Sequence, residues 1–390
     1  MAHRIVLFLF FISLGISQIL SAQIDSLKSI NPKIIGKENI LCSIPFRFID
    51  NRIYLQGSLN DKPCSFMYDI GSGGIGIDKS YAQQNNIGNR DQLEIRFNKY
   101  SITTSSYRLD DCKSLGSDAD EGILGIDFFK DYLVEIDYEN HVLNLYNLND
   151  SIDASYTKTD ATKIKGLPLW GCFAINLEVR LKDGTVLKGK YAFDTGSTRN
   201  ITILNPSNIE RVSEFVIKNA ENSSYFGNNK LKYFQVDRVF FNNSAFNNLI
   251  VDYSPDNEGE LLKVIDGIIG GQFLQNFKIL IDYEKGNLYM KNNPVMTSFV
   301  TSMYGNGIEF RDRRKDLGGL LVCRLTEHPN LISGDIKFND LIIQINGIDV
   351  SRMEYDYLLK IHQAENNAIN YKLKRGRKTI EVKTMTTRIL

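Results

Sequence analysis

The sequence predicts a mainly β protein that contains two similar lobes and a smaller third unit. One segment of the chain recurs, and Val, Ile, Tyr and Phe alternate with polar residues between turns of the Asn-Gly and Asp-Gly type. The pattern then changes after Pro294. Because 43% of the 390 residues are apolar, the composition is that of a globular protein large enough for several units.

Residues 1–22 have the layout of a secretory signal peptide. Arg4 precedes a run of Leu, Phe and Ile, and the small residues Ser21 and Ala22 follow it. We therefore expect a secreted or periplasmic, envelope-facing protein with no integral membrane segment after signal removal. The alternative is an uncleaved membrane anchor, for which the apolar stretch is short.

The internal repeat predicts one lobe over residues 23–150 and another over 151–295. Residues 122–146 and 267–291 are identical at nine of 25 positions, and each reads as a Gly-bounded strand, a short helical turn and a hairpin. Upstream of each copy, an apolar strand runs into Asp-x-Gly-Ser. The distance from this Asp to the strand is 53 residues in the first copy and 73 in the second, and we expect the extra residues within 205–262.

The two Asp-x-Gly-Ser segments predict a site that consists of carboxylates. Asp69 and Asp194 would stand in tight turns, where Gly71 and Gly196 permit a neighbouring chain to approach closely. A pseudo-twofold axis would bring the two carboxyls face to face, and carboxyls that close share one proton. One could activate water as a base while the other donates a hydrogen bond to a substrate carbonyl.

These motifs resemble those of the retropepsin-like and pepsin-like aspartic proteases. Asp69-Ile70-Gly71-Ser72 with Gly-Ile-Leu-Gly at 122–125, and Asp194-Thr195-Gly196-Ser197 with Gly-Ile-Ile-Gly at 267–270, carry the resemblance, which covers residues 45–291. It implies two pseudo-symmetric acid-protease β-barrel lobes, a hydrolase of the aspartic-type endopeptidase class, and Asp69 and Asp194 as the catalytic residues. The residues that it implies as supports of the catalytic loops are Gly71, Ser72, Thr195, Gly196, Ser197, Gly125 and Gly270.

The first motif departs from the family at Ile70, where the family has Thr or Ser. That hydroxyl supports the catalytic loops by hydrogen bonds across the lobes, and Ile supplies neither a donor nor an acceptor. The alternative function is therefore a catalytically weak or inactive peptide-binding protein with degenerate lobes, and a third is a structural envelope protein. The family also covers its substrate with a hairpin, where Tyr107 and its repeat partner Tyr225 could fall; the alternative is a strand-surface tyrosine.

Residues 300–390 resemble a PDZ domain. Gly-Asp-x-x-x-x-Asp-x-Ile-x-x-Ile-Asn-Gly, at 334–347, is the most specific piece, and a helix is expected at 353–363 with Met353, Tyr357 and Ile361 on one face. The resemblance implies that a peptide adds a strand and that its carboxylate is held near Gly307, Ile308, Glu309 and Phe310. Glu309 replaces the glycine usual there, so the ligand could be internal or absent.

The remaining counts restrict partners and cofactors. The 46 Lys and Arg balance 46 Asp and Glu, which gives no general attraction to nucleic acid. With four histidines and no Cys-x-x-Cys, we expect no metal and no cofactor. The five cysteines leave open a Cys64–Cys112 bridge or five free thiols. Because both lobes lie in one chain, we expect a monomer that acts on protein or peptide substrates.

Overall fold

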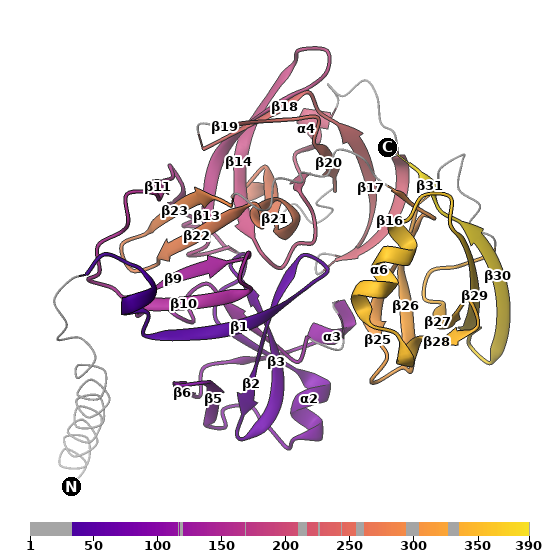
Figure 1. The fold of residues 1–390 in the computed structure, drawn as a ribbon, viewed down its shortest axis with the longest axis horizontal. Coiled ribbons are helices and arrows are strands. Elements are labelled where there is room, and N and C mark those ends of the chain that lie inside the picture. The colour runs from indigo at the N-terminus through magenta and orange to yellow at the C-terminus, as the bar shows by residue number, and fades with distance from the viewer. Residues whose placement is uncertain are drawn as a thin grey trace, which may run out of the picture.

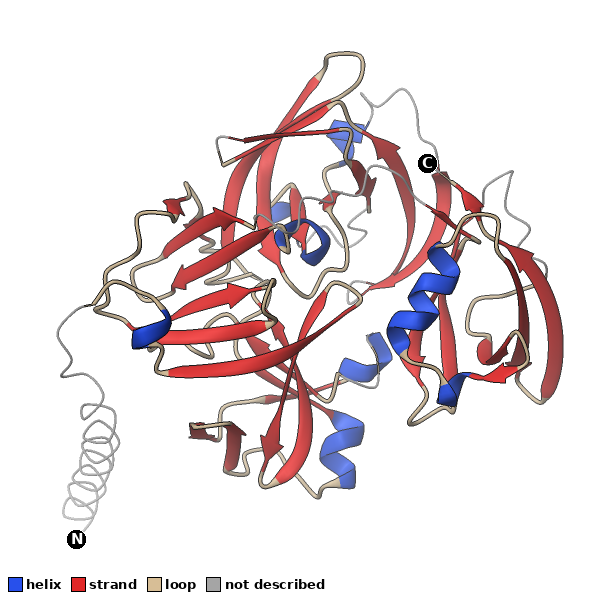
Figure 2. Cartoon of the chain, in the orientation of Figure 1, coloured by secondary structure: helices blue, strands red, loops and turns tan. Residues whose placement is uncertain are grey.

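The structure is a computed structural model that describes residues 33–115, 117, 120–167, 169–209, 217–224, 227–242, 244–254, 261–293, 304–326 and 335–389. The expected signal peptide, Tyr225, Pro294 and Gly334 lie outside these residues. Strands dominate the described chain, with a few short helices (Figure 2).

The elements of the first lobe are η1 (Lys37–Asn39), β1 (Cys42–Ile49), β2 (Arg52–Leu59), β3 (Lys62–Asp69), β4 (Ile75–Asp78), α2 (Lys79–Gln84), β5 (Leu93–Phe97), β6 (Tyr100–Thr104), β7 (Arg108–Asp110), α3 (Cys112–Leu115), β8 (Gly122–Gly125), β9 (Tyr132–Asp137) and β10 (Val142–Asn147). Those of the second lobe are β11 (Thr157–Lys158), β12 (Thr162–Lys163), β13 (Phe173–Arg180), β14 (Val186–Asp194), β15 (Ile201–Ile203), α4 (Pro206–Ile209), β16 (Ile217–Ser224), β17 (Gly227–Gln235), β18 (Arg238–Phe241), β19 (Ser244–Asn247), β20 (Ile250–Tyr253), η2 (Leu261–Lys263), β21 (Gly267–Gly270), α5 (Gly271–Leu274), β22 (Phe277–Asp282) and β23 (Asn287–Asn292).

The remaining elements form what we call the C-terminal module, residues 304–389. They are β24 (Tyr304–Gly305), β25 (Ile308–Arg313), β26 (Gly319–Thr326), β27 (Leu341–Ile345), β28 (Ile348–Asp349), η3 (Val350–Arg352), α6 (Tyr355–Gln363), β29 (Ala368–Arg375), β30 (Lys378–Met385) and β31 (Thr387–Arg388). Figure 1 shows the module, in orange to yellow, beside the two lobes.

A sheet shared by both lobes joins the two halves of the repeat. Its strands run in the order β11-β23-β22-β9-β10-β1, and β9 and β22 pair antiparallel at the junction (Figure 1). Glu135 of β9 stands opposite Leu280 of β22, and these two positions are equivalent in the repeat. The pseudo-twofold axis therefore passes through this pair, and the two pseudo-symmetric β lobes that the sequence predicts are confirmed.

The Gly-x-x-Gly strands hold the Asp loops from behind. β8 lies between β3, to which it is parallel, and β4, to which it is antiparallel; β21 lies in the same way between β14 and β15. The space is narrow, because a Cβ on Gly267 would lie 2.4 Å from the carbonyl oxygen of Thr202. This explains why glycine bounds both strands.

The hairpin of β16 and β17 accounts for the longer spacing in the second copy. Between α2 and β5 the first lobe has a loop, residues 85–92, where the second lobe has this hairpin. β16 also pairs antiparallel with β26, with Ala220 opposite Thr326. The sheet of the second lobe thus continues into the C-terminal module.

The module has a buried cluster of its own, whereas the two lobes share one. In α6 the buried face differs from the expected one. Leu358 is fully buried, while Tyr357, which we expected beside Met353, is 53% exposed. Met353 precedes the helix, so its position does not set the phase of the helical face. That the module is a PDZ domain stays a prediction.

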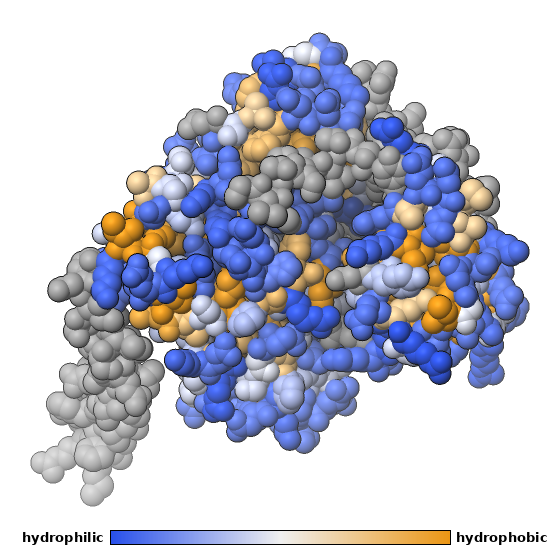
Figure 3. Space-filling model, in the orientation of Figure 1, coloured by the Kyte–Doolittle hydropathy of each residue, from blue (hydrophilic) through white to orange (hydrophobic). Residues whose placement is uncertain are grey.

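All five cysteines are free in the structure, so the expected alternative of a Cys64–Cys112 bridge is not formed. No helix in the described part of the chain has both the length and the apolar character needed to cross a bilayer. Figure 3 shows a largely hydrophilic face with apolar patches at the outer edge of the shared sheet and on the module.

Candidate active site

The two Asp-x-Gly loops meet at the interface between the lobes. A Cβ on Gly71 would lie 2.6 Å from the Cγ of Asp194, and a Cβ on Gly196 would lie 2.7 Å from Oδ2 of Asp69. Each glycine therefore packs against the carboxyl of the opposite loop, at a distance that no side chain would permit. Both aspartates are half-buried residues.

Backbone N–H groups orient the two carboxyls. Gly71 donates to Oδ1 of Asp69 at 2.8 Å, and Gly196 donates to Oδ1 of Asp194 at 2.8 Å. The N–H of Gly196 also lies 3.3 Å from Oδ1 of Asp69, and Ser197 donates to Asp194 at 2.9 Å. The N–H of Gly196 thus bridges the two acids.

The environment keeps these acids protonated to higher pH than ordinary aspartates. Burial raises the pKa of Asp69 well above its usual value, and the negative charge of Asp194 raises it further. Burial also raises the pKa of Asp194, while the hydrogen bond with Asp69, the N–H groups of Ser197 and Gly196, and the charge of Arg52 lower it. Because the two carboxyls interact, they titrate as a pair, and the pKa of each is raised above that of an ordinary aspartate.

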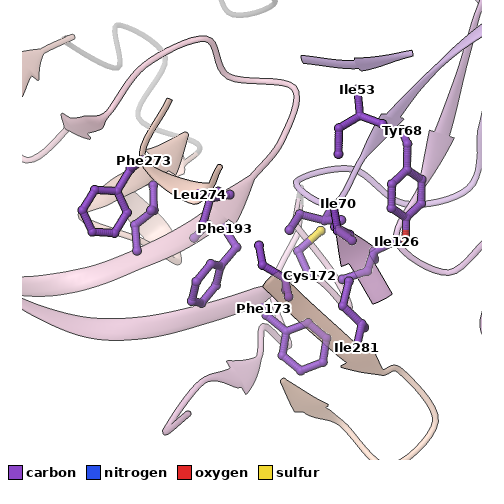
Figure 4. Close-up of a cluster of buried hydrophobic side chains, with 14 of the residues drawn as sticks. Ile53, Tyr68, Ile70, Ile126, Cys172, Phe173, Phe193, Phe273, Leu274 and Ile281 are labelled. Atoms are coloured by element: carbon purple, nitrogen blue, oxygen red, sulfur yellow. The ribbon is translucent and has the colours of Figure 1, made fainter. Parts of the chain in front are cut away.

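Thr195 ties the second loop to the first. Its hydroxyl donates to the carbonyl oxygen of Tyr68 at 2.8 Å and accepts from the N–H of Ile70 at 3.0 Å. Ile70 lies at the equivalent position and is fully buried in the cluster that also contains Cys172 and Ile126 (Figure 4). Because Ile70 has no hydroxyl, it cannot return the same pair of bonds to the second loop.

The other expected support residues lie behind the loops. Gly125 donates to the carbonyl oxygen of Gly74 at 2.8 Å, and the carbonyl of Ser72 accepts from Ile126 at 2.9 Å. On the second side, Gly270 donates to the carbonyl of Asn200 at 2.9 Å, and a Cβ on Gly270 would lie 2.8 Å from the Ser197 hydroxyl.

Three further residues hold the loops and were not predicted. Asp127 accepts from the N–H of Gly74 at 2.7 Å, which fixes the Gly73-Gly74 segment. Asn51 donates to the carbonyl of Thr198 at 2.9 Å, and Nε of Arg52 donates to the carbonyl of Gly196 at 2.7 Å. In each case a side chain bonds to backbone far away in sequence, for which residue patterns carry no signal.

The residues expected to capture a peptide carboxylate lie in the C-terminal module next to the second lobe. Glu309 is paired with Arg324 of the module and lies 3.8 Å from Arg199, which follows the second Asp loop. Burial raises the pKa of Glu309 to about 7, although Arg199 lowers it. Gly307 has a positive φ of 78°, while Ile308 and Phe310 are buried in the module.

Tyr107, considered as a hairpin residue over the substrate, ties down a surface loop. Its hydroxyl accepts from the N–H of Asp91 at 3.0 Å and also bonds to the carbonyl of Gly88. Tyr107 lies in the connection between β6 and β7 and packs against the buried cluster of the lobes, so it is not a strand-surface tyrosine either. Within the described residues, no group of three or more His, Cys, Asp or Glu is placed to hold a metal ion.

Comparison with known proteins yields a distant structural similarity. No family model matches the chain, and no curated protein is similar to it in sequence. Among solved structures, the crystal structure of an aspartic proteinase from Irpex lacteus is similar, with 12% identity and a TM-score of 0.42. The match covers 67% of this chain and 99% of that one. At this identity and TM-score the similarity supports no inference about activity. Any such inference must be argued from the geometry of the site.

We predict that Thr195→Val lowers the free energy of unfolding by about 1–3 kcal/mol, because it removes a buried hydroxyl with two partners and leaves a carbonyl and an N–H unpaired. Chemical denaturation measures the change. Thr157→Val, at an exposed strand position, is the control and should stay within about 0.5 kcal/mol of the parent. Equal effects of the two substitutions would contradict the role of this hydroxyl.

Proposed function

We propose that the protein is an aspartic-type endopeptidase in which Asp69 and Asp194 share a proton and activate water for attack on a peptide bond. One observation carries the proposal: each loop glycine packs against the opposite carboxyl, so the two acids stand together at the lobe interface. A carboxyl pair of this kind can do acid and base chemistry in one step.

The two acids would divide the work between them. The ionised carboxylate takes a proton from water as the water attacks the carbonyl carbon, and the protonated acid donates a hydrogen bond to the carbonyl oxygen. A raised pKa suits Asp69 to the second role, because it keeps its proton at pH values where ordinary aspartates have lost theirs.

The other parts of the proposal come from the sequence. The layout of residues 1–22 supports export to the periplasm or the outside of the cell. The presence of both lobes in one chain supports a monomeric enzyme that acts on protein or peptide substrates. The C-terminal module is proposed to bind peptide as a PDZ domain, although Glu309 already pairs with Arg324.

We predict that Asp69→Asn and Asp194→Asn each reduce cleavage of a fluorogenic peptide library to background. Wild-type activity should fall as the pH rises through the pKa of Asp69, because the proton that hydrogen-bonds the carbonyl is then lost. Pepstatin-type analogues should inhibit it.

The matched control is Asp61→Asn, which changes an exposed carboxylate that pairs with Arg96. It should cleave as the wild type does. Peptide cleavage that survives in either Asp69→Asn or Asp194→Asn would contradict the mechanism.

The second candidate is a peptide-binding protein without turnover, and Ile70 is the observation that favours it. Ile70→Thr separates the two functions. If the protein is an enzyme with an incompletely supported site, a hydroxyl at this position should raise kcat/KM by about tenfold, the effect of roughly one buried hydrogen bond. The measurement is kcat/KM for a cleaved peptide.

Ile126→Thr is the matched control, since it places a hydroxyl in the same buried cluster but outside the Asp loop. It should give no gain. Absence of turnover both before and after Ile70→Thr, together with calorimetric binding of peptide, would favour the binding protein.

A further inference from the structure

The two lobes hold each other's Asp loop by different means. The first loop is held from the second lobe by the hydroxyl of Thr195, which bonds to the backbone on both sides of Asp69. A symmetric molecule would hold the second loop from position 70, but Ile70 has no polar atom in its side chain. Some other group of the first lobe must therefore supply that contact if the second loop is to be equally ordered.

The hairpin between β1 and β2 makes this contact. Arg52 donates from Nε to the carbonyl of Gly196 at 2.7 Å, and Asn51 donates to the carbonyl of Thr198 at 2.9 Å. The hairpin tip also packs tightly on the second lobe, since a Cβ on Gly271 would lie 1.9 Å from the carbonyl oxygen of Asn51. The N–H of the same Gly196 bridges the two catalytic acids.

The repeat shows that this arrangement is one-sided. Ile53 stands opposite Tyr68, so the strand register places Arg52 opposite Asp69. Ala174 stands opposite Ala192, so the same register places Cys172 opposite Asp194. A cation thus occupies one of two equivalent positions and a buried neutral thiol the other. Although Arg52 stands opposite Asp69 in the sheet, its guanidinium bonds to the carbonyl of Gly196, two residues after Asp194, so its charge lies on the second loop and the two acids lie in unequal fields.

Other charged and titratable groups also face this region. Those around Arg52 are Asp50 and Tyr54 on its own hairpin, Asp120 before β8, and Arg311 on β25. Besides Arg52, Tyr68 lies close enough to Asp69, and Cys172 to both acids, for the carboxylate charges to add to burial in raising their pKa values, and the charge of Asp127 acts on both Tyr68 and Cys172.

We propose that Arg52 is a positioning residue that replaces the missing hydroxyl at position 70, and that its charge makes Asp194 the carboxylate and Asp69 the proton carrier. The assignment of catalytic roles rests on the proposed peptidase function, whereas the clamp on the second loop does not. The charge of Arg52 lowers the pKa of Asp194, which agrees with this assignment.

The test combines substitutions at the two positions. Arg52→Met removes both the bond and the charge, and Arg52→Lys keeps the charge but not the guanidinium geometry. We expect Arg52→Met to lower kcat/KM by about tenfold or more, as expected for a lost charge-assisted hydrogen bond. In the pH profile of kcat/KM, the acidic limb is the range in which activity rises as Asp194 loses its proton. This limb should move to higher pH in Arg52→Met, because the pKa of Asp194 rises when the charge of Arg52 is removed.

Arg52→Lys should leave that acidic limb where it is in the wild type. Adding Ile70→Thr to Arg52→Met should restore more activity than Ile70→Thr adds to the wild type, because the hydroxyl then holds a loop with no other clamp. Arg96→Met, which removes an exposed arginine from a neighbouring strand, should match the wild type in all respects.

Additive effects of Arg52→Met and Ile70→Thr would overturn the clamp, and an unmoved acidic limb in Arg52→Met would overturn the assignment of charge. The clamp can also be tested without activity, from the unfolding midpoints of the wild type, Arg52→Met, Ile70→Thr and the double variant. If the two groups hold the same loop, the changes in midpoint should not be additive. If the wild type cleaves no peptide, the proposed function fails, and non-additive midpoints still support the clamp while additive ones overturn it.

Discussion

The close contact between each loop glycine and the opposite carboxyl is the constraint on which the rest of the structure depends. Gly71 and Gly196 permit this contact, and any side chain at either position would force the lobes apart. To keep two acids in such proximity, the fold must hold both loops rigidly from behind and from the side. The Gly-bounded strands β8 and β21 do the first, and bonds between the lobes do the second. The shared sheet, whose axis passes between Glu135 and Leu280, then sets the two lobes in register.

The symmetry of the repeat is broken where it matters for chemistry. One loop is held by a hydroxyl and the other by a guanidinium, so a geometric near-copy becomes an electrostatically unequal pair. The second loop is also tied to the C-terminal module. Arg199 lies 3.8 Å from Glu309 of the module and bonds to Tyr233 of β17 at 2.5 Å, and the hydroxyl of Tyr233 also accepts from Arg324 of the module at 2.9 Å. Asp252, with its pKa raised to about 6 by burial, lies in the same region, close to Arg199. The second Asp loop, the hairpin of β16 and β17 and the module therefore share one charged junction.

Both lobes and both Asp loops could be predicted from the sequence, because two copies of one pattern are expected to fold into two similar units. The contacts that support the loops were less accessible. Arg52 bonds to a backbone carbonyl 144 residues away, and a carbonyl has no sequence signature. The repeat did not point to Asp127, because the equivalent residue in the second copy is Gln272 and the carboxylate is therefore not repeated. The face of α6 was mispredicted because Met353 precedes the helix, so counting from it gave Tyr357 the wrong side.

The account stands on one claim, that Asp69 and Asp194 form a proton-sharing pair. Titration of the wild-type protein followed by carbon-13 NMR of its aspartate carboxyls tests this claim without any substrate. We predict that Asp69 keeps its proton far above the ordinary aspartate value of about 3.9 and that its signal also responds when Asp194 ionises. Two independent titrations near the ordinary value would contradict the claim.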